Sequence, residues 1–136
     1  MEWTELVEKA KESGVGKTVL PDGNYKLKVE GTKYRDSSGN PQLIVEYSVV
    51  GGPYNGDKVT DFLTFSEKAA GIAIEKITSA GAGPDFFAEL QTVSGRTVNQ
   101  IGVDLIAGRL FPSGKVFEVA AKEKGGRNNF YIRSAV

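Results

Sequence analysis

Short segments in which apolar and polar residues alternate, separated by glycine-rich turns, constrain the fold of this chain more than any other feature. In residues 24–30, Tyr25, Leu27 and Val29 alternate with charged neighbours. A period of two predicts a β-strand with one buried face. The same kind of alternation recurs in residues 43–49, 58–65, 116–122 and 129–133. We therefore expect a mainly β fold built from five short strands.

Other stretches have the spacing of helices. Apolar residues recur at helical intervals in residues 2–12, which predicts a short N-terminal helix. After the third strand, Ser66 is a favourable N-cap, and an apolar stripe runs from there toward Gly81. This stripe predicts the principal helix of the fold. Residues 85–90 favour a short second helix, whereas residues 92–102 show only a weak pattern.

The length of 136 residues suits one domain. Three consecutive strands, a helix and a final two-stranded hairpin form the element order of the five-stranded OB-fold barrel. We expect a single OB-fold domain, with residues 1–17 as an N-terminal helical extension and residues 18–136 as the barrel. In that fold the surface of the second and third strands, with the 1–2 and 4–5 loops, binds oligonucleotides.

Composition excludes several classes of function. The chain has no cysteine and no histidine, so it lacks thiol chemistry, the usual general base and the commonest metal ligand. Its 17 basic and 17 acidic residues give a net charge of zero, so an anionic partner would need a local basic patch. No apolar run approaches the roughly 18 residues of a membrane span. We expect no cofactor, no metal and no membrane partner.

The face opposite the predicted core carries cations and aromatic rings, the two groups that single-stranded nucleic acids require. Lys26 and Lys28 alternate with the apolar residues of the first strand, and Lys58 and Phe62 with those of the third. By the same parity Tyr131 points outward from the last strand. With the basic and aromatic residues of the predicted loops, the candidate nucleic-acid-binding residues are Lys26, Lys28, Lys33, Tyr34, Arg35, Tyr54, Lys58, Phe62, Lys122, Lys124, Arg127, Tyr131 and Arg133.

Some of the aromatic residues have a second interpretation. A β-bulge would shift the register and turn Phe62 into the core, because a slip of one residue exchanges the two faces of a strand. Tyr54 lies in a glycine-rich turn and could simply cover the end of the barrel. Tyr25 and Tyr47 share the parity of the apolar residues, so we expect both in the core.

The acidic residues at the second and third strands offer an alternative, a metal site. Asp57 and Asp61 share one strand face, and with Glu46 they could hold two metal ions for phosphodiester cleavage. We interpret them instead as ordinary surface acids, and predict no catalytic residue. Lys68 and Lys76 lie beside acids on the predicted helix and are expected to be solvated.

Several sequence motifs are familiar from one protein family. LPDGNY (residues 20–25), GNPQL (residues 39–43) and VGGPYNGDKV (residues 50–59), followed by a helix, resemble bacteriophage single-stranded DNA-binding proteins. The resemblance covers roughly residues 18–81, and residues 105–109 with the final hairpin less specifically. It implies an OB-fold protein of phage replication or recombination in the cytoplasm of the infected bacterial host. Its implied partners are single-stranded DNA and phage replication or recombination proteins.

A protein of another class fits the same sequence. An OB-fold adaptor that binds other proteins in a phage replication or recombination complex would suit the neutral net charge and an exposed Ile44. A nuclease is the third alternative. The sequence leaves open whether the chain forms a homodimer and whether it prefers DNA or RNA.

Overall fold

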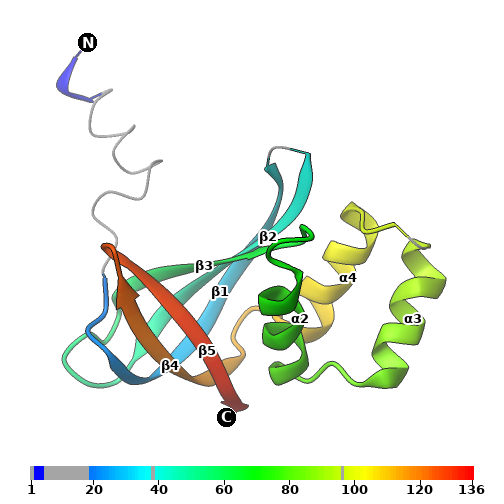
Figure 1. Ribbon diagram of the computed structural model, residues 1–136. Helices are drawn as coiled ribbons and strands as arrows, with labels where there is room; N and C mark the ends of the chain where they lie inside the picture. Colours follow the sequence, from blue (N-terminus) through cyan, green and yellow to red (C-terminus); the bar gives the residue numbers. More distant parts are fainter. Residues whose placement is uncertain (1, 5–18, 38, 96) are drawn as a thin grey trace.

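The computed structural model describes residues 2–4, 19–37, 39–95 and 97–136 (Figure 1). Five strands and three helices follow one another in this part of the chain. Their order is β1 (Gly23–Ser37), β2 (Asn40–Val50), β3 (Lys58–Thr64), α2 (Ala70–Ser79), α3 (Pro84–Ser94), α4 (Gln100–Leu110), β4 (Val116–Lys124) and β5 (Arg127–Ala135).

The five strands form one antiparallel sheet in the order β3-β2-β1-β4-β5. β1 is 15 residues long and pairs with β4 near its start and with β2 along most of its length. The register between β1 and β2 shifts between Val29 and Gly31, and such a bulge bends and twists a strand. β1 can therefore serve both halves of a strongly curved sheet, which is visible in Figure 1.

The predicted mainly β fold of five strands is confirmed, but two details differ. The edge strands β3 and β5 are not hydrogen-bonded neighbours, so the sheet does not close into the expected barrel. Three helices, not one principal helix, lie between β3 and β4. The helix expected at residues 85–90 is present as α3, which is longer than predicted. α4 was not predicted. The predicted N-terminal helix at residues 2–12 falls almost entirely outside the described residues.

α4 begins at a side-chain N-cap and buries one of its faces. The side chain of Asn99 accepts a hydrogen bond from the backbone N–H of Gly102 at 3.1 Å and caps the helix. Val103, Ile106 and Leu110 then face the core. Glycine is a weak helix former, and Gly102 within the first turn obscures the pattern in the sequence.

Among the described residues, no helix is both long and apolar enough to cross a membrane.

The core lies on the concave side of the sheet, where the apolar positions of all five strands meet α2 and α4. Leu27, Tyr47 and Phe117 are each at most 1% exposed. α2 contacts β3 and β5, and α4 contacts β1 and β2. The expected burial of Tyr47 is confirmed. The inward positions of the strands include Leu27, Val29, Leu43, Val45, Tyr47, Val49, Val59, Leu63, Phe117, Val119, Ala121, Phe130 and Ile132.

A buried ion pair joins α2 to β3, contrary to the sequence-based interpretation of both residues. The Nζ atom of Lys76 donates to Oδ1 of Asp61 at 2.7 Å, and both side chains are less than a tenth exposed. Burial raises the pKa of the Asp61 carboxyl, and the Lys76 ammonium opposes that rise. Asp61 is therefore not a surface acid, and Lys76 is not on a solvated helix face. Asp61 occupies an inward strand position, and Lys76 the inward face of α2.

Candidate nucleic-acid interface

The outer face of β1, β2 and β3 carries most of the predicted cations. Lys33, Ile44 and Phe62 lie opposite one another on the three strands, and so form one row across the sheet. Phe62 is 49% exposed. β3 pairs with β2 from Lys58 to Thr64 without a register shift, so the bulge that would have buried Phe62 is absent from this pairing.

A second row continues the same face. Lys28, Ser48 and Lys58 lie opposite one another on β1, β2 and β3. Two residues closer to the start of β1, Lys26 lies opposite Val50. We call the outward cations of these strands, together with the ring of Phe62, the cationic strip. Its members are Lys26, Lys28, Lys33, Arg35, Lys58 and Phe62.

Two carboxylates partly neutralise the positive charge of the strip. Lys33 pairs with Glu46 at 3.1 Å, and Lys28 approaches Glu30 at 3.6 Å. Ser48 donates a hydrogen bond to Glu30 at 2.5 Å. This hydrogen bond, with the charges of Lys28 and Lys58, holds the pKa of the Glu30 carboxyl below its usual value despite partial desolvation.

The remaining cations of the strip are available to a ligand. Lys26, Arg35 and Lys58 form no ion pair with any residue in the described ranges. Lys26, Arg35 and Lys58 are also exposed. Since exposed surface ion pairs contribute about 0–1 kcal/mol, phosphates could also displace the carboxylates from Lys28 and Lys33 at small cost.

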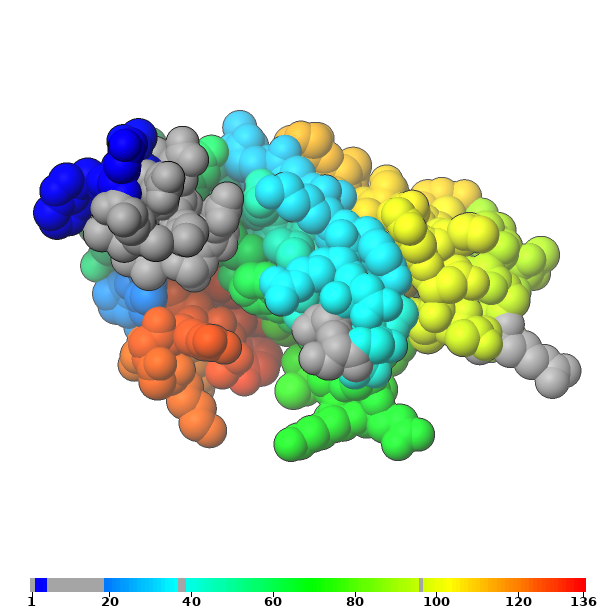
Figure 2. Space-filling view, turned by 90° about the horizontal axis from the view of Figure 1, so that it is seen from above, coloured from blue at the N-terminus to red at the C-terminus, as the bar shows by residue number. Residues whose placement is uncertain are grey.

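Two hairpins flank this face. The β1–β2 hairpin carries Arg35, and the β4–β5 hairpin carries the exposed Lys122, Lys124 and Arg127. The β4–β5 turn consists of Gly125 and Gly126 with φ of 61° and 78°, the left-handed pair that a tight two-residue hairpin needs. Seen from above, the two hairpins lie on either side of the surface around β3 (Figure 2).

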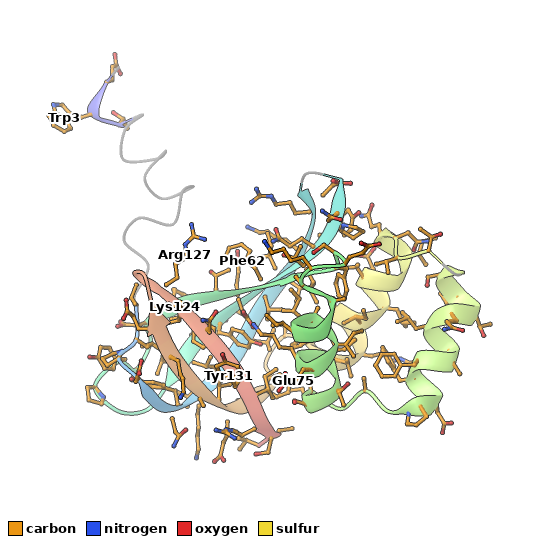
Figure 3. All side chains as sticks on the ribbon, in the orientation of Figure 1. Trp3, Phe62, Glu75, Lys124, Arg127 and Tyr131 are labelled. Carbon is orange, nitrogen blue, oxygen red and sulfur yellow. The ribbon has the colours of Figure 1, made fainter. Side chains whose placement is uncertain are left out.

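Tyr34 and Tyr131 do not join the strip. β1 continues through Ser37, so Tyr34 lies on a strand, not in the predicted loop. It lies opposite the buried Leu43 and packs partly against the core. Tyr131 is 41% exposed, as its parity predicted, but it lines a small hollow against α2 with Ile72 and Glu75 (Figure 3).

Tyr54 and Arg133 line a different hollow, an open groove at the start of β1. They share it with Tyr25, which had been assigned to the core but is only half-buried. The Tyr25 hydroxyl donates a hydrogen bond to the carbonyl of Pro21 at 2.7 Å. Burial raises the pKa of Tyr25, and the electrostatic effects of Tyr54 and Asp22 raise it further. Sequence reasoning also missed Glu118 in this groove, although the alternation of β4 already placed it on the outer face.

The alternative metal site is not assembled. Asp61 points into the core, whereas Glu46 lies on the outer face beside Lys33. Within the part of the chain that the structure describes, no three acidic side chains come together where they could hold a metal ion.

Comparison with known protein families matches part of the chain. A protein-family model described as "Protein of unknown function (DUF669)" matches residues 7–80, more than half of the 136 residues. No curated protein matches the chain.

Proposed function

The chain belongs to the DUF669 family, and from the geometry above we propose that it binds single-stranded DNA without sequence preference. Exposure of Phe62 within the cationic strip carries this proposal. A half-exposed ring on the same strand face as the exposed Lys58 is costly to leave in water, but it offers a base a surface to stack on. Stacking on such a ring contributes about 1–3 kcal/mol per base and does not depend on base identity.

The arrangement of the strands supports an OB-type architecture as part of this proposal. The OB fold is a partly open five-stranded barrel whose second and third strands bind oligonucleotides between the 1–2 and 4–5 loops. Here the members of the strip lie on β1 and β3, on either side of the outward residues of β2, and the β1–β2 and β4–β5 hairpins flank them. We propose phage replication or recombination in the host cytoplasm as the setting, on the sequence resemblance described above.

Fluorescence anisotropy with labelled oligo-dT tests the proposal. We expect oligo-dT to bind more tightly than duplex DNA. For each tenfold increase in salt, its binding constant should fall by about 0.7 log units per neutralised phosphate. Lys58→Ala should weaken binding and reduce that slope, because Lys58 carries no ion pair with a described residue.

Lys68→Ala is the matched control, since it removes one exposed lysine from the segment between β3 and α2, which is not part of the strip. It should leave both affinity and slope close to those of the unaltered protein. Equal effects of the two substitutions would contradict a defined strip and indicate diffuse attraction.

A protein-interaction adaptor is the second candidate, and exposed apolar residues on α2 favour it. Ile72 is 60% exposed and Ile74 43% exposed, and Ile72 shares a hollow with Tyr131. Docking of a protein there would lack the steep salt dependence of phosphate binding. The same salt titration therefore separates the two functions.

A further inference from the structure

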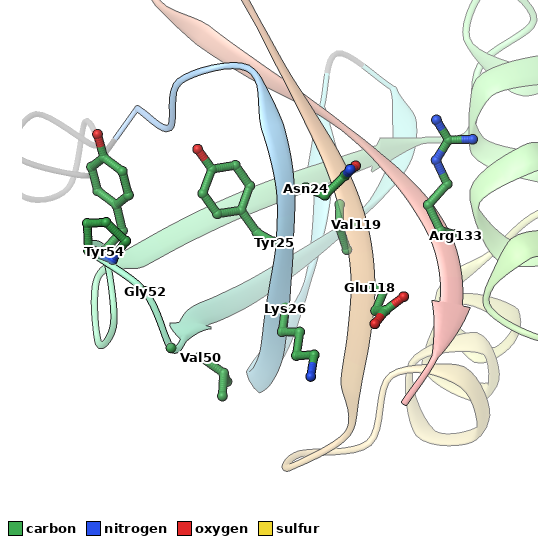
Figure 4. Close-up of a pocket in the computed structure, with 11 residues that line it drawn as sticks. Asn24, Tyr25, Lys26, Val50, Gly52, Tyr54, Glu118, Val119 and Arg133 are labelled. Carbon is green, nitrogen blue, oxygen red and sulfur yellow. The ribbon is translucent and has the colours of Figure 1, made fainter.

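The groove at the start of β1 has the dimensions of a ligand site. Its volume is about 670 Å³, within the range of roughly 300–1,000 Å³ typical of small-molecule pockets. β1 forms its floor, the β2–β3 turn one wall, and β4 and β5 the other (Figure 4). Tyr54 lies on the first wall and Arg133 on the second.

One wall of the groove is aromatic. The rings of Tyr25 and Tyr54 meet edge to face, with centroids 6.2 Å apart and planes at 74°. Beside them Gly51 and Gly52 have φ of 80° and 71°, a left-handed backbone that glycine adopts without strain. Because these residues have no side chains, a flat ligand can approach the backbone of the turn closely.

The floor and the β4–β5 wall of the groove carry cations. Lys26 and Arg133 line it and form no ion pair with any described residue, and Glu118 is the one acid among the lining residues. Two cations against one carboxylate leave a net positive lining. Aromatic faces beside unpaired cations are the groups that bind nucleotides, through base stacking and phosphate contacts.

The groove continues the cationic strip. Lys26 belongs to both, since it lies opposite Val50 on β2 and opposite Glu118 on β4, and all three residues line the groove. A path from Phe62 through Lys58 and Lys26 to Arg133 crosses the sheet diagonally. From about 3.4 Å per residue and about 4.8 Å between strands, this path measures on the order of 35 Å. A path of this length can take more nucleotides than the strip alone, and OB domains bind roughly 4–16 nucleotides.

We propose that the groove binds the nucleotides of the same single strand where it leaves the cationic strip, with Tyr54 as stacking surface and Arg133 as phosphate contact. The inference rests on the proposed function and extends its site. Short oligomers then occupy the strip alone, and only longer ones reach the groove.

Oligomer length is the variable that tests this path. Affinities are measured for each variant with oligo-dT of about 4 and about 16 nucleotides, the two ends of the range of site sizes for OB domains. Arg133→Ala and Tyr54→Leu should each weaken binding of the long oligomer at least about fivefold and leave the short one unchanged. Phe62→Ala should weaken both. Glu118→Gln should strengthen binding of the long oligomer only, because it removes the acid from the groove.

Lys68→Ala controls for loss of a charge outside the strip and the groove, and it should bind both oligomers like the unaltered protein. Arg133 is exposed, so its variant remains informative if Tyr54→Leu fails to fold. If Phe62→Ala weakens binding but Arg133→Ala affects neither oligomer, or both equally, the path through the groove is wrong while the proposed function stands. If the unaltered protein binds neither oligomer, both proposals are wrong.

Discussion

At the scale of single residues, Phe62 decides whether the outer face of the sheet can bind bases. Phe62→Ala should weaken oligo-dT binding by about 1–3 kcal/mol, because it removes a stacking surface. The melting temperature should change little, since the ring is 49% exposed. Binding by anisotropy and melting by circular dichroism check the two expectations, with Phe62→Tyr as the ring-retaining control. A steep loss of stability, near the 3–5 kcal/mol of a core phenylalanine, would contradict the assignment.

Glu30 links the stability of the same face to pH. Its folded-state pKa lies below the usual 4.5, first through the Ser48 hydrogen bond and then through the charges of Lys28 and Lys58. A lowered carboxylate pKa contributes stability above the unfolded-state value, and this contribution is lost as the pH falls through the folded-state value. Glu30→Gln should therefore be less stable than the unaltered protein at pH near 7, and the difference should shrink below the usual pKa. Urea denaturation across this pH range measures it, and a difference that grows on acidification would contradict the sign.

At the scale of elements, the Asp61–Lys76 pair holds α2 against β3. Lys76→Met leaves the buried Asp61 carboxylate without its cation and should cost about 3–5 kcal/mol. Burial already raises the pKa of Asp61, and losing Lys76 raises it further. A raised carboxyl pKa favours the folded state at low pH, so the deficit of Lys76→Met should shrink on acidification.

The double variant Asp61→Leu with Lys76→Met is the control for this pair. Replacing both charges by apolar groups should recover most of the loss, because neither residue then needs desolvation of a charge. Urea denaturation of the single and double variants compares them directly. If the double variant were as unstable as Lys76→Met alone, packing and not the unpaired charge would cause the loss.

At the scale of the whole molecule, the sheet separates two of the three acids of the alternative metal site. Asp61 and Glu46 lie on opposite faces of the sheet, so they cannot share metal ions. Labelled single-stranded and duplex DNA, incubated with the protein and Mg²⁺ or Mn²⁺, should both remain uncut on a denaturing gel. Cleavage that disappears with Asp61→Asn would overturn the proposal that the protein only binds DNA.

Local alternation by itself determined the strands and the faces of their side chains. The parity of β1 and β3 placed Leu27 and Leu63 inward and Lys26 and Phe62 outward, because successive side chains of a strand point to opposite sides whatever lies around them. The turn at Gly125 and Gly126 was equally readable, since its left-handed backbone is a local property of glycine.

Tertiary structure decided the features that depend on residues far apart in the sequence. The period of two could place Asp61 on a face, but only the approach of α2 shows that Lys76 reaches it there. The openness of the sheet depends on how far the bulge at Val29 and Gly31 bends β1. The groove needs Tyr54 and Arg133 from segments joined only by the folded sheet. Alternation is set by backbone geometry within one strand, whereas curvature and charge pairing depend on contacts between elements.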